Sequence, residues 1–413
     1  MKTRQVKHKG LILFVCTWVI CGYALLSFRP TVAQARTGSA TLGAILADGS
    51  GQVIYKKNAG RPFIPASILK ILTGLTAFDV LGVSYRFPTL FYFDDTTKNL
   101  YVKGFGDPLF ISEVIQQFCR QILQTYQIKR INRIIIDDSY FSKEITIPGK
   151  GASLNPYDAT VGALSANFNT IMFTRSAGHT FISAEPQTPL LPVFLPEIRQ
   201  TGLTEGRIIL SPEKSRIYPG LLIGHFLKSK GIDLSGRVEI GVFPQKTDMV
   251  SHTFHSPFEL TAVVQKLLKY SNNFMANQLV LAMGAKEHQA PATLEKGVAS
   301  VKRFAEQKLS LTGPILTEGS GLSRENRITP EQMLAVLFAF KPYYELLNKQ
   351  GTDHYKTGTL TGIRTRAGYF SGKDHRLYPY VIMTQNDHNA YHRVYEKLRK
   401  MVDTHSSKNS STP

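Results

Sequence analysis

The sequence is poor in cysteine, tryptophan and acidic side chains. It holds three cysteines and one tryptophan among 413 residues, and its 30 Asp and Glu are outnumbered by 49 Lys and Arg, which gives a formal net charge of +19. So few cysteines exclude a scaffold held together by disulfides. Charged residues make up only 19% of the chain and no long low-complexity block is present, so disorder is not expected. The 43% hydrophobic content can instead build a sizeable core, which we expect to be divided between two domains.

The N-terminus indicates where the chain acts. A basic start is followed by an apolar run at 11–28 and by Ala33-Gln34-Ala35, a pattern typical of signal-peptidase cleavage. We therefore predict a cleaved signal peptide over 1–35. The alternative is an uncleaved membrane anchor, because about 18 apolar residues just suffice to span a bilayer. In both cases the bulk of the chain is expected in the periplasm or cell envelope.

Export changes the interpretation of the charge. Residues 1–35 contain five basic and no acidic side chains, so the mature chain would carry +14. An anionic cell-wall polymer or membrane surface is then the expected partner, and nucleic acid is not. Loss of the signal also leaves Cys119 as the sole cysteine. It lies in an apolar helical pattern at 114–126, so we expect a buried core residue rather than a nucleophile.

The hydrophobic periodicity indicates a domain that is interrupted by an insertion. A strand-like hairpin at 40–55 and an apolar helix at 67–80 come first. Amphipathic helices and strands resume after Pro257 and end in a helix at 391–402. Glycine and proline punctuate the segment between them, which mixes short β runs with helices. We expect an α/β domain over 36–82 and 252–405, a mixed α/β inserted domain over 83–251, and a polar tail over 406–413.

The first of three short motifs is Ser67-Ile68-Leu69-Lys70, at the start of the apolar helix. A three-residue step places both polar side chains on one helix face, about one turn apart. A serine hydroxyl becomes a strong nucleophile when a neighbouring base takes its proton, and a desolvated lysine with a lowered pKa can be that base. A second match, Ser211-Pro212-Glu213-Lys214, lies in a turn-like stretch and is disfavoured.

The second motif is Ser271-Asn272-Asn273, at the end of an amphipathic helix. The Ser271 hydroxyl can relay a proton, while the Asn273 amide can bind both a substrate amide and the catalytic lysine. Helix-end capping would explain the same residues without any chemistry. A rival match, Ser165-Ala166-Asn167, lies in the predicted insertion.

The third motif, Lys356-Thr357-Gly358-Thr359, occurs once. On an edge strand, Lys356 and the Thr357 hydroxyl would bind a carboxylate, and Gly358 would leave room for a substrate backbone. The backbone N–H of Thr359, with that of Ser67, would form an oxyanion hole. A solvated turn is the alternative. The order of the three motifs, each in the helix, helix-end or strand setting that its role requires, favours the catalytic interpretation.

With these motifs the sequence resembles the penicilloyl serine transferases. More narrowly, it resembles the class C low-molecular-mass penicillin-binding proteins, the D-Ala-D-Ala carboxypeptidase/endopeptidase family. That family carries a large insertion between its first two motifs, as this chain does. The insertion is shorter here than in the larger members, and Glu318 stands where the family usually has Asp. Further shared marks are Gly106–Leu109, Asp137–Phe141, Leu164–Asn169 and Gly319–Arg324.

The resemblance implies an α/β (α+β) penicillin-binding, serine β-lactamase-like transpeptidase fold and an enzyme that needs no metal or other cofactor. Ser67 would attack the carbonyl between two D-alanines of a peptidoglycan stem peptide, with Lys70 as base and Ser271 as proton shuttle. Asn273, Lys356 and Thr357 would bind the peptide. β-Lactams would acylate Ser67 because they mimic that peptide.

Two more charged residues are candidates for recognising the zwitterionic end of a diaminopimelate side chain. Asp137 lies in a shared insertion motif and Arg324 on a glycine-rich loop. Structural salt bridges or solvated loop charges explain both residues equally well.

Three rival functions remain. A β-lactamase would use the same nucleophile, but it normally lacks so large an insertion and needs a fast deacylation base. A non-catalytic wall-binding protein could keep the fold and bind through its charge. A metallopeptidase is suggested by His388 and His392, four residues apart, but no Glu accompanies them in a His-Glu-x-x-His arrangement, so we predict no metal site.

Overall fold

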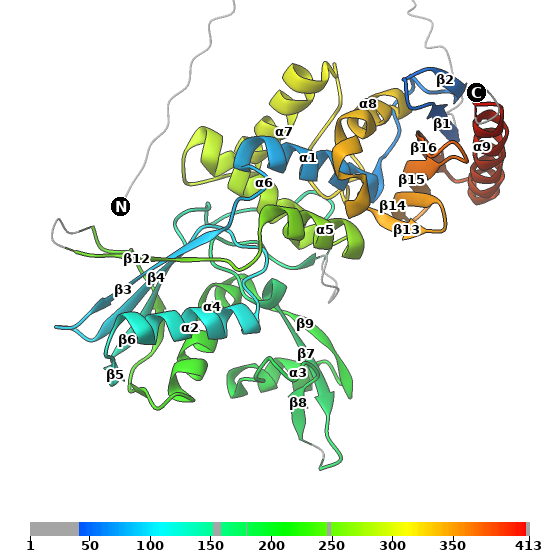
Figure 1. The fold of residues 1–413 in the computed structure, drawn as a ribbon. Coiled ribbons are helices and arrows are strands. Elements are labelled where there is room, and N and C mark those ends of the chain that lie inside the picture. The colour runs from blue at the N-terminus through cyan, green and yellow to red at the C-terminus, as the bar shows by residue number, and fades with distance from the viewer. Residues whose placement is uncertain (1–40, 152–157, 179, 246–248, 410–413) are drawn as a thin grey trace, which may run out of the picture. The chain divides into compact units, whose positions relative to one another are not determined.

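A computed structural model describes residues 41–151, 158–178, 180–245 and 249–409 (Figure 1). The predicted signal peptide at 1–35 lies outside the described residues. The described residues form one compact unit. No helix within the described ranges combines the length and the hydrophobicity that a membrane span requires.

The first and last described segments of the chain share a six-stranded antiparallel sheet (Figure 1). β1 (Leu42–Ala47) pairs with β16 (Leu377–Gln385), with Leu42 opposite Thr384. The strand order is β13-β14-β15-β16-β1-β2. The remaining strands are β2 (Val53–Lys57), β13 (Asn348–Gln350), β14 (Asp353–Leu360) and β15 (Ile363–Ser371).

Helices cover both faces of this sheet, which explains why its central strands are apolar almost without interruption. Successive side chains of a strand point to opposite faces. Along β16, Val381 and Met383 therefore join a large helical core, whereas Tyr380 and Ile382 pack against α9. The helices are α1 (Leu69–Leu81), α5 (Leu260–Tyr270), α6 (Asn273–His288), α7 (Leu294–Leu309) and α8 (Pro330–Phe340) in that core, and α9 (His388–Asn409) on the other face.

The segment between α1 and α5 has a hydrophobic core of its own. Its five-stranded sheet has the order β11-β6-β4-β3-β12, and α4 packs against it together with α2. A three-stranded sheet, β8-β7-β9, lies in the same segment. The elements are β3 (Pro88–Asp94), β4 (Asn99–Gly104), α2 (Ser112–Thr125), β5 (Arg130–Ile131), β6 (Arg133–Asp137), β7 (Thr170–Arg175), β8 (Phe181–Ser183), α3 (Leu195–Gln200), β9 (Glu205–Ile209), α4 (Pro212–Lys228), β10 (Asp233–Leu234), β11 (Val238–Ile240) and β12 (His252–His255).

The inserted domain extends further along the chain than predicted. β12 pairs with β3, so the sheet of the insertion extends to His255, past the boundary expected at 251. The predicted polar tail starts inside α9, where Ser406 is fully buried. Its hydroxyl donates to the Val402 carbonyl at 2.7 Å, and this bond allows a polar residue to continue the helix. Cys119 is buried as expected, and burial raises the pKa of its thiol to about 12.

The second Ser-x-x-Lys match is not a turn. Ser211 is the N-cap of α4 and accepts a hydrogen bond from the Lys214 backbone N–H at 3.3 Å, while Pro212 occupies the first helical turn. Proline is favoured there because the first N–H groups of a helix have no intrahelical partner. The Lys214 ammonium pairs with Glu197 instead of the serine hydroxyl. Helix capping therefore accounts for this motif.

Candidate active site

Ser67 lies in a short 3₁₀ turn, η1 (Ala66–Ile68), immediately before α1. Ala66 has a positive φ of 47°, a left-handed conformation that costs a non-glycine residue about 1 kcal/mol or more. The surrounding chain leaves Ala66 little freedom, since a Cβ built on Gly321 would meet its carbonyl oxygen at 1.9 Å. A strained, tightly enclosed turn thus presents the serine.

Lys70 is fully buried one helical turn from Ser67. Its ammonium donates to Ser67 Oγ at 2.9 Å, Asn273 Oδ1 at 2.7 Å and the Ser320 carbonyl at 2.7 Å. Three acceptors match the three N–H groups of a lysine ammonium. If one proton is lost, two donors can keep Asn273 and Ser320, and a lone pair can face the serine hydroxyl. The arrangement therefore suits a base for Ser67.

The electrostatic surroundings favour the neutral form of Lys70. Burial, and after it the positive charge of Lys356, lowers the pKa of Lys70 well below its ordinary value of 10.5, against an opposing effect of the Glu318 carboxylate. Removing a cation from water disfavours its charged form. Lys70 is thus closer to a neutral amine at physiological pH than an exposed lysine would be.

The second motif joins α5 to α6, and each of its three residues has a different hydrogen-bond partner. Asn272 is the N-cap of α6 and accepts a hydrogen bond from the Met275 N–H at 3.0 Å. Ser271 has a left-handed φ of 53°, and its hydroxyl accepts from Lys356 Nζ at 2.7 Å. Asn273 accepts from Lys70. Capping therefore explains the middle residue only, and the outer two contact the lysines of the other motifs.

Lys356 lies on the part of β14 that pairs with no described strand on one side. β13 pairs only with Asp353, His354 and Tyr355, so the strand is an edge from Lys356 onward. The Lys356 side chain is 2% exposed, and its ammonium also donates to the Thr357 carbonyl at 2.7 Å. Burial lowers the pKa of this ammonium to about 8. Near neutral pH it remains mostly a cation.

Besides the space predicted for a substrate backbone, Gly358 leaves space for another part of the protein chain. A Cβ at this position would lie 2.3 Å from Thr365 Oγ1, 2.6 Å from the Ser67 backbone nitrogen and 2.9 Å from the Ala66 Cβ. Thr365 cannot easily yield, because its hydroxyl donates to the Pro65 carbonyl at 2.7 Å. Gly358 therefore makes room for η1, the protein's own serine-bearing turn.

Glu318 holds the neighbouring loop in place, a role that the three motifs did not predict. It is 2% exposed, and one carboxylate oxygen accepts from the backbone N–H and the hydroxyl of Ser320, both at 2.6 Å. Its other oxygen accepts from Asn326 Nδ2 at 2.9 Å and from the Ser323 N–H at 3.3 Å. These bonds fix the loop whose Ser320 carbonyl accepts from Lys70. In the sequence, the acidic residue before Gly319-Ser320-Gly321 is the feature that could have indicated this role of Glu318.

A cavity of about 460 Å³ opens beside this group. The Arg324 guanidinium donates to the Thr361 carbonyl, which belongs to a residue of the lining. Neither Lys356 nor Thr357 is among the residues that line the cavity, whereas Thr359 of the same strand is. The lining consists of Ser67, Ser271, Asn273, Gly321, Leu322, Thr359, Leu360 and Thr361.

Asp137 is not part of this group. Its side chain is 1% exposed at the end of β6, where its carboxylate forms an ion pair with Lys103 at 3.1 Å. It also accepts from the backbone N–H groups of Ser139 at 2.9 Å and Phe243 at 2.8 Å, which help to lower its pKa. Its surroundings match the structural salt bridge, one of the two alternatives left open for this residue.

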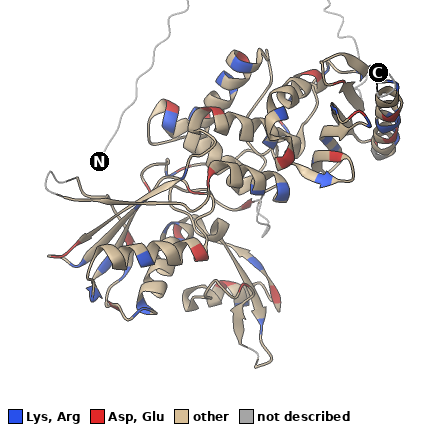
Figure 2. Ribbon diagram, in the orientation of Figure 1, with Lys and Arg blue, Asp and Glu red and all other residues tan. Residues whose placement is uncertain are grey.

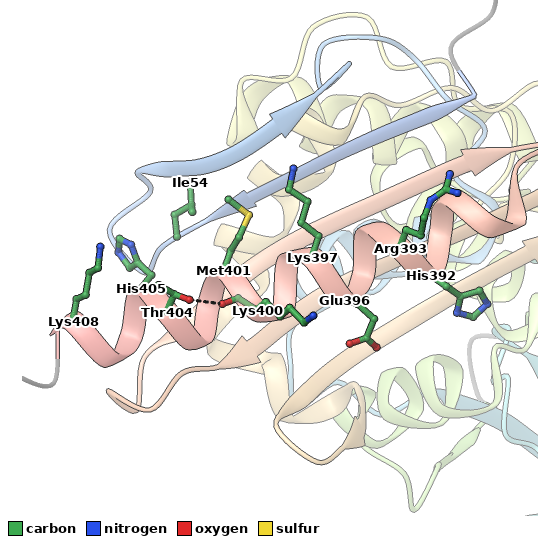
Figure 3. A pocket seen from close by; sticks show the side chains of 10 residues that line it. All are labelled: Ile54, His392, Arg393, Glu396, Lys397, Lys400, Met401, Thr404, His405 and Lys408. Carbon is green, nitrogen blue, oxygen red and sulfur yellow. Dashed lines mark hydrogen bonds between the residues drawn. The ribbon is translucent and has the colours of Figure 1, made fainter.

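A larger cavity, of about 800 Å³, lies along the exposed face of α9 (Figure 3). Four of the ten side chains that line it are Lys or Arg, among them Arg393, Lys397 and Lys400, and the figure shows no serine or cysteine among the ten. His392, considered above as a metal ligand, contacts the Arg364 guanidinium at 3.3 Å. Among the described residues, no group of three or more His, Cys, Asp or Glu is placed to bind a metal. Size alone therefore does not identify the site of chemistry.

The sequence is similar to known protein families and proteins. The family model described as "D-Ala-D-Ala carboxypeptidase 3 (S13) family" matches residues 29–193 and 205–345. A D-alanyl-D-alanine carboxypeptidase from Actinomadura sp. (strain R39) is 23% identical over 414 residues, which cover 82% of this chain and 76% of that protein.

Two solved structures share the fold. Penicillin binding protein 4 from Haemophilus influenzae superposes with a TM-score of 0.69 at 20% identity, covering 84% of this chain and 90% of that one. The penicillin G-acylated predatory endopeptidase Bd3459 from Bdellovibrio bacteriovorus gives a TM-score of 0.55 at 16% identity, covering 89% and 92%. The predicted fold class, a penicillin-binding fold with an additional mixed α/β part, is confirmed.

Proposed function

Because the chain belongs to the D-Ala-D-Ala carboxypeptidase 3 (S13) family, we propose that it cleaves peptidoglycan stem peptides as a serine-type D-Ala-D-Ala carboxypeptidase, DD-endopeptidase or both, through an acyl-enzyme on Ser67. The observation that carries this proposal is the convergence of three distant motifs. Lys70 bridges Ser67 and Asn273, and Lys356 contacts Ser271, all by direct hydrogen bonds. Burying a lysine ammonium costs folding free energy. A lysine beside a serine hydroxyl can activate that serine as a nucleophile, which gives the buried position a chemical function.

In the proposed acylation, neutral Lys70 takes the proton of Ser67 while Oγ attacks the carbonyl between two D-alanines. The backbone N–H groups of Ser67 and Thr359 stabilise the oxyanion, where each such donor contributes about 3 kcal/mol. Asn273 binds the peptide amide. The hydroxyl of Ser271 gives its proton to the departing amine as the C–N bond breaks. The proton that Lys70 took from Ser67 then restores the Ser271 hydroxyl, which leaves Lys70 neutral for the next step.

Lys356 is proposed to bind the carboxylate of the departing residue, with Thr357 as a further donor. Water then attacks the acyl-enzyme with Lys70 as its base, which releases the shortened peptide and restores Ser67. A β-lactam would acylate Ser67 in the same way, but its opened ring stays attached and cannot leave as D-alanine does. β-Lactams are therefore proposed to be covalent inhibitors.

The two charged candidates outside the three motifs receive different proposals. Arg324 is exposed beside the Ser67 cavity, so we retain it as a residue that recognises an anionic group of the stem peptide. For Asp137 we propose a structural role, since its oxygens are occupied by Lys103 and backbone donors.

Export to the periplasm or cell envelope, by a cleaved signal or a retained anchor, is part of the proposal. An anionic wall polymer or membrane surface remains the proposed partner of the positive charge. Lys and Arg are distributed over many of the described helices and strands (Figure 2), which suits a general attraction to a polyanion rather than one specific groove.

The test is release of D-alanine from a pentapeptide that ends in D-Ala-D-Ala. Wild-type protein and Ser211→Ala, which alters the other Ser-x-x-Lys match, should release D-alanine at equal rates, and Ser67→Ala should release none. Equal activity of Ser67→Ala and wild type would overturn the proposal in favour of a non-catalytic or differently catalytic protein. Rapid turnover of nitrocefin, instead of a stable adduct, would favour a β-lactamase.

A further inference from the structure

The cavity of about 800 Å³ beside α9 is separate from the catalytic group. α9 packs on one face of the six-stranded sheet, whereas α1, which carries Lys70, belongs to the helical core on the other face. None of the residues that line this cavity also lines the cavity at Ser67. A ligand bound beside α9 would therefore leave Ser67 accessible to substrate.

One wall of this cavity belongs to the outermost strand of the sheet. β2 pairs with β1 and with no other described strand, so one edge of its backbone has N–H and C=O groups without a strand partner. Ile54 of β2 lines the cavity, and its neighbour Val53 is 44% exposed. An unpaired strand edge is a place where an extended peptide can add to a sheet.

The opposite wall is a row of side chains along α9. Arg393, Lys397, Met401 and His405 recur at every fourth residue, which places them on one face of the helix. Figure 3 shows Arg393 and Lys397 on the side of α9 that faces β2, and Glu396 on the side away from it. The row therefore begins with two cations and continues with an apolar side chain.

Contacts between the two walls support this arrangement. The Lys397 ammonium lies 4.4 Å from the centre of the Tyr55 ring of β2. Ile54 of β2 and Met401 of α9 both pack against the hydrophobic cluster under α9. The groove thus has cations at one end and apolar side chains beside them.

The positive charge of the groove is not balanced by the described part of the chain. Neither Arg393 nor Lys397 forms an ion pair with another described residue. β2 adds Lys56 and Lys57, whose side chains are exposed. Since complementary charge selects partners at an interface, the expected ligand is anionic.

We propose that the groove between β2 and α9 docks an extended, acidic segment of a partner protein, which adds to the sheet as a strand beside β2. The backbone of the segment pairs with the free edge of β2. On the side toward α9, its acidic side chains contact Arg393 and Lys397, and its apolar side chains contact Ile54 and Met401.

Two other occupants fit these observations less well. A membrane surface has no peptide backbone to pair with the edge of β2. A second copy of this chain, paired edge to edge, would bring Lys56 and Lys57 of both copies together, and like charges on neighbouring strands are destabilising. The groove also differs from the general attraction of the net charge to polyanions, because it requires an extended backbone and apolar side chains as well as charge.

The first test is binding of a fluorescein-labelled peptide, Glu-Thr-Glu-Thr-Val-Thr-Val, measured by fluorescence anisotropy. Its Glu and Val side chains share one face of a strand. The reversed sequence is measured too, because an added strand can run in either direction. Wild-type protein should bind one of the two, with an affinity that falls as salt is added. The same peptides with Lys in place of Glu should not bind.

Matched variants separate the groove from the overall charge. Arg393→Glu/Lys397→Glu should raise the Kd of the acidic peptide by about tenfold or more, because two ion pairs are replaced by repulsion. The control, Lys286→Glu/Lys302→Glu, changes the net charge equally through exposed lysines of α6 and α7 and should bind as wild type does. Acylation by benzylpenicillin should be unchanged in both, which also shows that both are folded.

The second test is hydrogen exchange of the wild-type backbone. Binding of the acidic peptide should slow exchange at 53–57, where the added strand pairs. A peptide with Pro in place of each Thr loses the N–H groups that could pair with the edge of β2. It should therefore bind weakly and give no protection at 53–57.

Four results would each overturn the proposal. They are equal losses of peptide affinity in the two double variants, no binding of either acidic peptide up to about 1 mM, binding without protection at 53–57, and binding of phosphatidylglycerol vesicles through Arg393 and Lys397 without peptide binding. The last result would make the groove a membrane contact. None of them bears on the proposed peptidase, whose own test is the reaction of Ser67.

Discussion

Replacing Gly358 by alanine tests how the nucleophile turn and the edge strand are held together. The added methyl group would lie 2.6 Å from the Ser67 nitrogen, whereas ordinary contact begins at 3.4 Å. β14 or η1 must therefore move by roughly 0.8 Å, and overpacking of this kind costs about 1–3 kcal/mol. The movement separates the N–H groups of Ser67 and Thr359. Since one oxyanion donor contributes about 10²-fold to 10³-fold, acylation should slow by about two orders of magnitude.

The assay is the rate of acylation by benzylpenicillin, followed by intact-protein mass spectrometry, with thermal unfolding measured on the same samples. Gly60→Ala is the matched control, because a Cβ there meets only Glu331 Oε2 at 3.5 Å. The control should acylate at the wild-type rate. Gly358→Ala should remain folded and acylate slowly. A Gly358→Ala protein that acylates as fast as wild type would refute the tight packing of β14 on η1.

Three other predictions follow from the same geometry. Cleavage of a carboxylate-bearing peptide should have a bell-shaped pH profile of kcat/KM: activity rises with pH as Lys70, whose pKa is lowered by burial, loses its proton, and falls above pH about 8 as Lys356 loses its charge. A profile with no decline above pH 8 would contradict the assignment of Lys356. Lys70→Met should slow acylation by about 10²-fold to 10⁴-fold, the usual contribution of a general base, with little change in the melting temperature; a wild-type rate would show that another group takes the Ser67 proton. Asp353→Asn, on the α9 face of the sheet, leaves the buried Arg366 without its anion. It should destabilise the fold by about 3–5 kcal/mol in denaturant titrations while the folded fraction acylates normally, and a change below 1 kcal/mol would contradict a buried ion pair.

Local patterns are sufficient to find the three motifs in the sequence, because each motif is defined by a short spacing. Ser67 and Lys70 lie one helical turn apart, and any helix at that position brings them together. The contacts of Gly358 could not be predicted from short spacings. Ser67 lies near Gly358 because η1 packs on β14, and Thr365 lies near it because β15 pairs with β14. The same limit applies to Glu318, which also accepts a hydrogen bond from Asn277 Nδ2 of α6 at 3.3 Å.

Errors at element ends have physical causes as well. Ser406 was assigned to a polar tail by composition, yet its hydroxyl bonds back to the preceding turn and it is buried inside α9. Pro212 was interpreted as a turn residue, although the first turn of a helix accepts proline readily. For Asp137, the sequence left two roles open because Lys103 lies on a neighbouring strand, a pairing that only the fold reveals.

The most direct test of the central claim is peptide mapping of the protein after reaction with benzylpenicillin. Convergence of the Ser67, Ser271 and Lys356 motifs predicts a single penicilloyl group, attached to Ser67, and no adduct in Ser67→Ala. An adduct on another residue, or no adduct on a folded wild-type protein, would contradict the account.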